Sequence, residues 1–258
     1  MSRRRKRIVI ITGASSGLGK EFALQLDRIL YKTDEMWLIA RRKERLEELA
    51  KSLSISTRLL PMDVTGQEDM AAFRKLLEKE QVAVHMLINC AGFGLMGGFA
   101  ELDVEEQMTM VEVDCKALMR MTHYCLPYMH RNAHILQLAS SAAFLPQKNF
   151  AIYAACKSCV LSFSRALGEE LRERQIWVTA VCPGPVDTEF FDIAERYGST
   201  LAVKKLTMVS ADKVVSMALR DAAKKRPVSV CSLPMQAFWI LAKILPHSWI
   251  LQGMNLLK

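Results

Sequence analysis

The sequence has no apolar run long enough to cross a membrane as a helix. Such a helix needs about 18 or more consecutive apolar residues, and no run of that length occurs in the 258 residues. The basic start of the chain is followed by only four apolar residues, Ile8 to Ile11, before Thr12 and Gly13. That run is too short for the core of a secretory signal, so we predict a cytoplasmic protein.

A disulfide framework and clusters of metal ligands are also missing. The seven cysteines lie scattered in apolar segments, so we expect most of them to be small buried side chains rather than members of disulfides in this compartment. Cys156-x-x-Cys159 has no second pair to complete the four ligands that zinc usually takes, and the five histidines show no ligand spacing. We predict helix packing for this cysteine pair and no metal site.

Strong charge is confined to one end of the chain. Hydrophobic residues make up 51% and charged residues 24%, which is typical of globular proteins and excludes the disordered and fibrous classes. The net charge is +8, and residues 3–7 alone contribute five positive charges. We predict a solvated basic arm over residues 1–6 and no nucleic-acid binding, while contact of the arm with a membrane surface stays open.

Apolar runs typical of buried strands alternate along the chain with helical patterns. The predicted strands are Arg7–Thr12, Met36–Ala40, Leu59–Met62, His85–Asn89, His134–Leu138, Trp177–Cys182 and Val228–Cys231. The predicted helices are Gly17–Tyr31, Lys43–Lys51, one opened by the capping-box spacing of Thr65 and Glu68, one from an Asp103 cap to about Arg131, Phe150–Arg174 and Ser210–Lys225. This alternation predicts an α/β fold: a single Rossmann-like domain over residues 1–258, with a doubly wound parallel sheet and helices on both faces.

A glycine-rich turn links the first predicted strand to the first helix. Its sequence is Thr12-Gly13-Ala14-Ser15-Ser16-Gly17-Leu18-Gly19. At this place in a doubly wound fold, backbone amides and the helix N-terminus favour a phosphate; a tight turn without a ligand is the alternative. We predict dinucleotide contacts from Gly13, Ser15, Ser16, Gly17, Leu18 and Gly19.

Two arginines, Arg41 and Arg42, follow the second predicted strand. An acidic residue at this place would bind the 2′-hydroxyl of NAD, whereas arginine accommodates the 2′-phosphate of NADP. Because guanidinium groups match phosphate geometry, we predict that the cofactor is NADP(H) rather than NAD(H). The alternative is that both arginines only begin an exposed charged helix.

Further motifs follow in a fixed order along the chain. Together with the glycine turn they are Asp63-Val64, Asn89-Cys90-Ala91-Gly92, Ser140, Tyr153-x-x-x-Lys157, and Pro183-Gly184 with Thr188. In this order the motifs resemble the short-chain dehydrogenase/reductase family, from Arg7 to about Val230. The resemblance implies an oxidoreductase that transfers hydride between a nicotinamide and a carbonyl or alcohol.

The resemblance also implies roles for the cofactor-binding residues. Asp63 and Val64 would lie beside the adenine, and Asn89, Ala91 and Gly92 would border the cofactor. Pro183, Gly184, Val186 and Thr188 would lie by the nicotinamide. Cys90 replaces the second asparagine of the family's usual Asn-Asn-Ala-Gly motif, and we expect this change to be tolerated.

The catalytic group implied by the resemblance is Ser140, Tyr153 and Lys157. A carbonyl that accepts hydride needs a proton, which Tyr153 can donate, and a nearby ammonium would lower the high pKa of a phenol. Lys157 lies four residues further on, on the same helix face. In the family this lysine also bonds the nicotinamide ribose. Ser140 would hold the carbonyl oxygen, with Ser141 as a supporting hydroxyl.

The sequence departs from the family at Asp114, where a catalytic asparagine is usual. An ionised aspartate only accepts hydrogen bonds, and its charge could pair with Lys157 and oppose the lowering of the Tyr153 pKa. We predict a slower proton relay. A cofactor-binding sensor or interaction protein with weak catalysis is the alternative.

The apolar C-terminal segment, residues 232–258, has several interpretations. It could pack on its own domain, lie in a membrane interface, cover an apolar substrate pocket or contact another subunit. We predict a small-molecule carbonyl or alcohol substrate. If this segment covers the pocket, the substrate would be apolar. The resemblance implies a homo-dimer or homo-tetramer, while peripheral membrane contact stays open.

Overall fold

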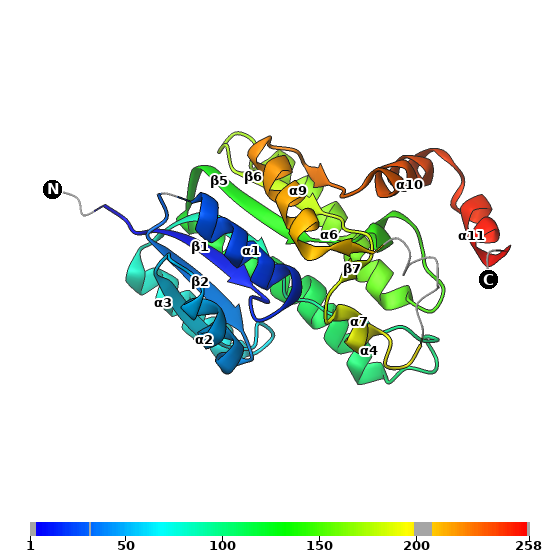
Figure 1. The fold of residues 1–258 in the computed structure, drawn as a ribbon, viewed down its shortest axis with the longest axis horizontal. Helices are drawn as coiled ribbons and strands as arrows, with labels where there is room; N and C mark the ends of the chain where they lie inside the picture. Colours follow the sequence, from blue (N-terminus) through cyan, green and yellow to red (C-terminus); the bar gives the residue numbers. More distant parts are fainter. Residues whose placement is uncertain (1–3, 31, 199–207, 257–258) are drawn as a thin grey trace.

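A parallel sheet with helices on both faces forms the protein (Figure 1). The structure, a computed structural model, describes residues 4–30, 32–198 and 208–256. The strand order is β3-β2-β1-β4-β5-β6-β9, and every neighbouring pair is parallel. The strands are β1 Arg7–Thr12, β2 Glu35–Ala40, β3 Thr57–Pro61, β4 Ala83–Asn89, β5 Met129–Leu138, β6 Trp177–Val181 and β9 Val228–Ser229. The predicted Rossmann-like fold class is thereby confirmed.

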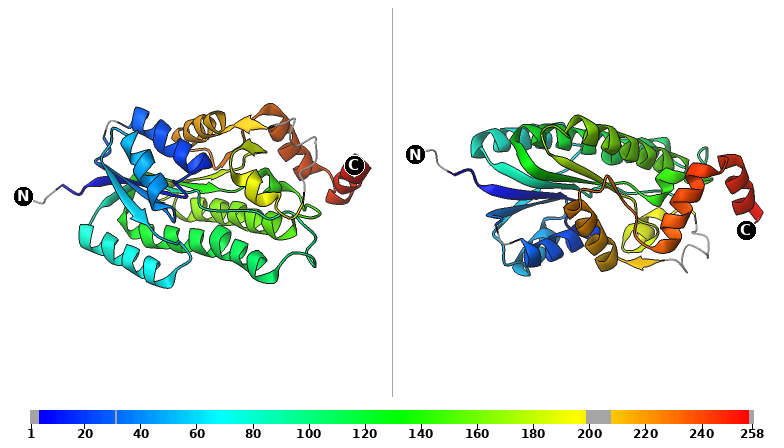
Figure 2. Two further views of the ribbon diagram at one scale, coloured as in Figure 1. Left: turned by 60° about the horizontal axis from the view of Figure 1, so that its bottom comes forward. Right: turned by 90° about the horizontal axis from the view of Figure 1, so that it is seen from above.

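Helices form a layer on each side of this sheet (Figure 2). Up to β5 they are α1 Gly17–Ile29, α2 Lys43–Lys51, α3 Gln67–Glu80, α4 Val104–Val111, the π-helix η1 Glu112–Ala117, α5 Leu118–Cys125 and the 3-10 helix η2 Leu126–Tyr128. After β5 they are the 3-10 helix η3 Ser141–Phe144, α6 Ala151–Glu170, α7 Phe190–Ala194, α9 Ala211–Ala223, α10 Leu233–Ile244 and α11 His247–Leu256. A small separate pairing joins β7 Val186–Asp187 to β8 Val209–Ser210. Among the described residues, no helix combines the length and the apolar character that crossing a membrane requires.

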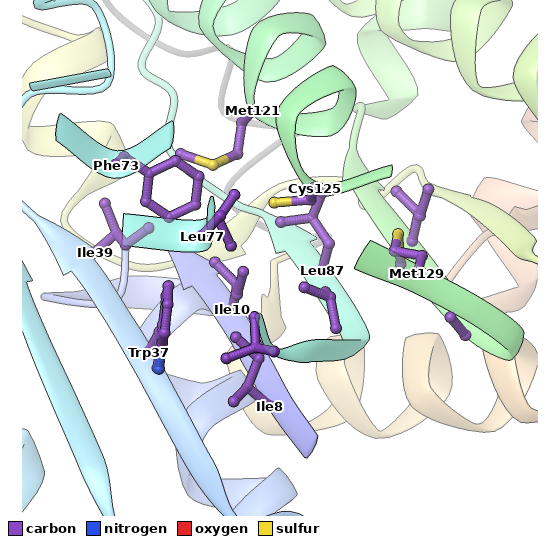
Figure 3. Close-up of a cluster of buried hydrophobic side chains, with 14 of the residues drawn as sticks. Ile8, Ile10, Trp37, Ile39, Phe73, Leu77, Leu87, Met121, Cys125 and Met129 are labelled. Carbon is purple, nitrogen blue, oxygen red and sulfur yellow. The ribbon is translucent and has the colours of Figure 1, made fainter. Parts of the chain in front are cut away.

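The strand β1 shows why the sheet is covered on both faces. Its side chains alternate: Ile8 and Ile10 face the core under α3 and α5, whereas Val9 and Ile11 face the core under α1 and α9. All four are fully buried, as period-two alternation between two apolar layers requires. Figure 3 shows the first of these cores around Trp37.

One predicted helix boundary is wrong. The helix expected to run from Asp103 to about Arg131 ends earlier, and β5 begins at Met129 rather than at His134. Pro127 lacks the N–H that a continuing helix needs, and Met129 pairs with Val84 of β4. The amino-terminal end of β5 therefore contains residues whose local pattern is helical.

The two predicted N-terminal caps have different outcomes. Asp103 caps α4, since its carboxylate accepts from the N–H of Glu106 at 2.9 Å. The capping box at Thr65 is wrong, because α3 starts after Gly66 and Thr65 instead bonds to Asp63. The other element boundaries agree within about four residues. The predicted helix end at Tyr31, residues 1–3 of the arm and residues 257–258 lie outside the described residues.

Candidate active site

A cavity of about 900 Å³ lies along the carboxyl ends of the central strands. Ligands of open α/β sheets bind at this edge. Of the predicted site residues, all but Asn89 and Asp114 line this cavity. The lining residues among them are Gly13, Ser15, Ser16, Gly17, Leu18, Gly19, Arg41, Arg42, Asp63, Val64, Ala91, Gly92, Ser140, Tyr153, Lys157, Pro183, Gly184, Val186 and Thr188.

The glycine turn leaves one end of this cavity open to an anion. A Cβ on Gly19 would lie 2.2 Å from the carbonyl oxygen of Gly13, so no side chain fits between turn and helix. The N-cap of α1, Ser16, makes no side-chain cap bond, and the first turn of α1 has no acidic residue. The first amides of α1 therefore remain available to a phosphate.

The Arg42 guanidinium lies directly beside the turn. It donates to the hydroxyl of Ser16 at 2.8 Å and to that of Ser15 at 3.2 Å. It also pairs with Glu189 at 3.1 Å, and Arg45 pairs with the same carboxylate. The hydrogen bond from Arg45 and that from Arg42 hold the pKa of Glu189 below its usual value. Neither Glu189 nor Arg45 is predicted from the sequence, because their contacts join α2 to a distant loop.

Asp63 lies at the same end of the cavity with its carboxylate held in place. Burial raises its pKa, but hydrogen bonds from the N–H and the hydroxyl of Thr65 outweigh this. Those bonds measure 2.8 and 2.7 Å. The net result is a pKa below the usual value of an aspartate. A fixed acceptor therefore faces the cavity beside Val64.

Ser140, Tyr153 and Lys157 meet at the other end of the cavity. Ser140 ends the segment after β5, while α6 presents Tyr153 and Lys157 on one face. The Lys157 ammonium donates to the carbonyl oxygen of Leu138 at 3.0 Å and lies 5.4 Å from the centre of the Tyr153 ring. The Ser140 oxygen accepts from the N–H of Ala142 at 3.1 Å. The hydroxyl proton of Ser140 can therefore be donated elsewhere.

Asp114 lies behind the cavity wall rather than in it. The side chain is fully buried on η1, and its Oδ2 forms an ion pair with the Lys157 ammonium at 3.2 Å. Its Oδ1 accepts from the N–H of Phe93 at 3.1 Å. A Cβ on Gly92 would lie 2.6 Å from Oδ1, so only glycine lets this loop cover the carboxylate.

The buried charges act on one another and on the tyrosine. Burial raises the pKa of Asp114, against the effect of Lys157. Burial alone would lower the pKa of Lys157, but Asp114 and Tyr153 raise it above its ordinary value. Burial also raises the pKa of Tyr153; Lys157 and a hydrogen bond with Ser140 lower it, and Asp114 raises it. Tyr153 therefore keeps its proton at neutral pH.

Comparison with known proteins identifies the family of the chain. A family model described as short chain dehydrogenase matches residues 7–196. The chain belongs to the short-chain dehydrogenase family. An uncharacterized oxidoreductase of Staphylococcus epidermidis is 30% identical over 201 residues, which cover 76% of this chain and 86% of that protein. The resemblance inferred from the motifs is thus confirmed.

Solved structures of short-chain dehydrogenases have the same fold. One from Sphingobium yanoikuyae, in complex with NADPH, has a TM-score of 0.79 and 28% identity, covering 96% of this chain and 95% of that chain. One from Burkholderia phymatum, in complex with NAD, has a TM-score of 0.78, covering 93% and 94%. Its identity is 22%, so that likeness shows the fold alone.

In this dehydrogenase the side chain of Asn89 does not reach the cavity. Its amide nitrogen donates to the hydroxyl of Thr122 at 2.9 Å and to the side-chain oxygen of Gln137 at 2.8 Å. All three side chains are buried. The structure therefore places Asn89 between β4, α5 and β5, where it joins these elements.

The dehydrogenase also has an aromatic wall that the sequence did not predict. The rings of Phe150 and Tyr153 stack with centroids 4.2 Å apart, and Phe190 lies 5.5 Å from Tyr153. Phe93, Phe191 and, from α10, Met235 and Phe238 also line the cavity. Phe150 is the N-cap residue of α6 and lies three residues before Tyr153, so the predicted helix from Phe150 could have indicated it. Phe190 begins α7, a helix of five residues that is too short to show a periodic pattern.

Proposed function

We propose that this short-chain dehydrogenase is an NADP(H)-dependent oxidoreductase that interconverts a carbonyl and an alcohol. One observation carries the proposal: Ser140, Tyr153 and Lys157 line the same cavity as the glycine turn. A proton donor and a phosphate-binding turn in one cavity suit hydride transfer from a dinucleotide. The apolar wall supports an apolar carbonyl substrate.

The residues present fit such a cofactor. The open N-terminus of α1 would bind the pyrophosphate, and Asp63 would lie beside the adenine. Arg42, beside Ser15 and Ser16, would bind a 2′-phosphate and so favour NADP(H). When bound, the nicotinamide supplies or accepts the hydride.

The protein's own groups would manage the proton and the charge on oxygen. Tyr153 donates its phenolic proton to the carbonyl oxygen as the neighbouring carbon gains hydride, and takes that proton back in the reverse direction. Ser140 donates a hydrogen bond to the same oxygen and stabilises its developing charge. Lys157 keeps its ammonium beside the phenolate, and its remaining N–H suits a ribose hydroxyl.

A second candidate function is cofactor binding with weak catalysis. The observation that favours it is the ion pair of Asp114 with Lys157, since a carboxylate beside the lysine raises the pKa of Tyr153. Such a protein would bind NADPH tightly and turn over slowly. The cytoplasmic location and the homo-oligomer remain predictions.

The test measures NADPH oxidation with a panel of apolar ketones and aldehydes, alongside NADPH binding by calorimetry. We expect turnover that prefers NADPH over NADH and falls at least ~10²-fold in Tyr153→Phe, with unchanged NADPH affinity. Tight NADPH binding with no turnover above Tyr153→Phe would support the binding protein instead. Absence of NADPH binding would contradict both candidates.

A further inference from the structure

The helix α10 has apolar side chains on both of its long faces. The inner face packs on the protein: Phe238 and Trp239 contact Phe144, with ring centroids 6.3 and 6.1 Å apart. The outer face repeats at helical spacing and points away from this core. Its residues are Leu233, Ala237, Ile240, Leu241 and Ile244, all exposed.

No described residue covers this outer face. Leu233 is 80% exposed and Ile244 72%, and on α11 Trp249 is 65% exposed. Half of the large hydrophobic side chains that the described residues expose lie between 233 and 249. Because a helix that is apolar all round is normally buried, this face requires a further partner.

The position of the two helices suits a broad, flat partner. α10 and α11 lie at one end of the molecule, and α11 projects beyond the sheet and its helix layers (Figures 1 and 2). Residues 4–6 of the basic arm, which lead into β1, lie at the opposite end. Met235 and Phe238, on the inner face of α10, line the cavity. The apolar outer face and the cavity thus lie on two sides of one helix.

A second copy of the chain suits this surface less well than a lipid bilayer does. A 12-residue helix is about 18 Å long and about 10–12 Å across, so one face covers a few hundred Å². A stable protein interface buries about 800 Å² on each partner. A bilayer interface sets no such minimum area, because each inserted apolar side chain adds to the binding.

The polar residues of the segment also match a lipid surface. Residues 222–258 contain no aspartate or glutamate, so nothing there repels anionic headgroups. Lys243 is exposed, and its ammonium lies 3.9 Å from the centre of the Trp239 ring. Tryptophan and lysine at the edge of an apolar face are typical of helices that lie in a membrane interface.

We propose that the outer face of α10, with Trp249 of α11, docks this protein on an anionic lipid bilayer. The apolar side chains enter the headgroup boundary while Lys243 stays among the headgroups. The cavity then lies one helix away from the membrane surface. This docking does not depend on the proposed reaction.

The experiment is co-sedimentation of the full chain with vesicles of phosphatidylcholine containing about 30% phosphatidylglycerol. The test variant is Ile240→Gln, Ile244→Gln, Trp249→Gln, which removes three exposed side chains. The matched control is Ile29→Gln, Phe99→Gln, Val104→Gln, three side chains of similar exposure on other elements. We expect the test variant to bind vesicles at least ~10-fold more weakly than wild type. The control variant should bind vesicles like wild type, and both variants should keep the wild-type affinity for NADPH.

A second measurement does not depend on the folding of the triple variant. Lipids brominated near the headgroup should quench the tryptophan fluorescence of the unaltered protein, and Trp249→Phe should remove most of that quenching. Wild-type protein that stays in the supernatant, or a test variant that sediments like wild type, overturns the proposal. So does an oligomer in solution that the test variant dissociates while vesicles bind neither form, since the face would then hold a second copy.

Discussion

The Asp114 carboxylate and the Lys157 ammonium form a buried ion pair, 3.2 Å apart, directly behind the end of the cavity that Tyr153 lines. Lys157 is also the cation that lowers the pKa of Tyr153, whereas Asp114 raises it. One aspartate thus sets both how firmly the lysine is charged and how readily the tyrosine gives up its proton. An asparagine at this place would keep the contact with Phe93 without the charge.

Substitution of Asp114 by asparagine should therefore shift the pH profile of the reaction. Removing the negative charge lowers the pKa of Tyr153, so the fall in reduction rate at high pH should move to lower pH. At neutral pH the proton relay should become faster. The measurement is kcat/KM for NADPH-dependent reduction between pH 6 and 10. Glu112→Gln is the control; Glu112 is a half-buried residue of η1 that pairs with Lys116. An unchanged profile in Asp114→Asn would contradict the role given to Asp114.

Most of the Tyr153 end of the cavity could be predicted from the sequence because its parts are local. Tyr153 and Lys157 are one helical turn apart, and Ser140 follows a strand whose apolar run is unmistakable. The contacts that the sequence did not reveal join distant segments. Glu189 reaches Arg42 across 147 positions, and Met129 joins the sheet only because Val84 lies beside it. Local periodicity contains no information about such pairs.

Substitution of Arg42 by alanine should weaken NADPH much more than NADH. A charge-assisted contact to a 2′-phosphate contributes about 1.5–3 kcal/mol, so we expect the Kd for NADPH to rise ~10–100-fold and that for NADH to change little. Glu189→Gln should act in the opposite direction, because it frees Arg42 from its ion pair. Calorimetric titration of both cofactors measures this. An equal loss of affinity for the two cofactors would mean that Arg42 does not read the 2′-phosphate.

Substitution of Asn89 by alanine tests which of two roles this residue has. The family resemblance implies a cofactor contact, whereas the hydrogen bonds in this structure join β4 to α5 and β5. The change leaves the buried Thr122 and Gln137 side chains without one partner each. An unsatisfied buried polar group costs about 1–3 kcal/mol, so the free energy of unfolding in urea should fall by about that amount. NADPH affinity should change less than about threefold, because Asn89 does not line the cavity. A loss of cofactor affinity with unchanged stability would show that the cofactor contact dominates.

Acid should destabilise the protein through His85, which lies far from the cavity. Burial first, and then the charges of Arg7 and His134, lower the pKa of His85 from 6.5 to about 4, and the Arg7 guanidinium lies 2.9 Å from its Nε2. Between pH 4 and pH 6.5, His85 of the unfolded chain therefore binds a proton more readily than His85 of the folded protein. The stability that depends on an uncharged His85 is complete above pH 6.5 and is lost as the pH falls towards 4. After allowance for solvent screening we expect the free energy of unfolding to fall by about 1–2 kcal/mol.

Urea unfolding at pH 7.5 and pH 4.5 should show this loss in wild type and in the exposed control His123→Gln. His85→Gln should lose less stability over the same interval, and an equal loss would place the acid sensitivity at other groups.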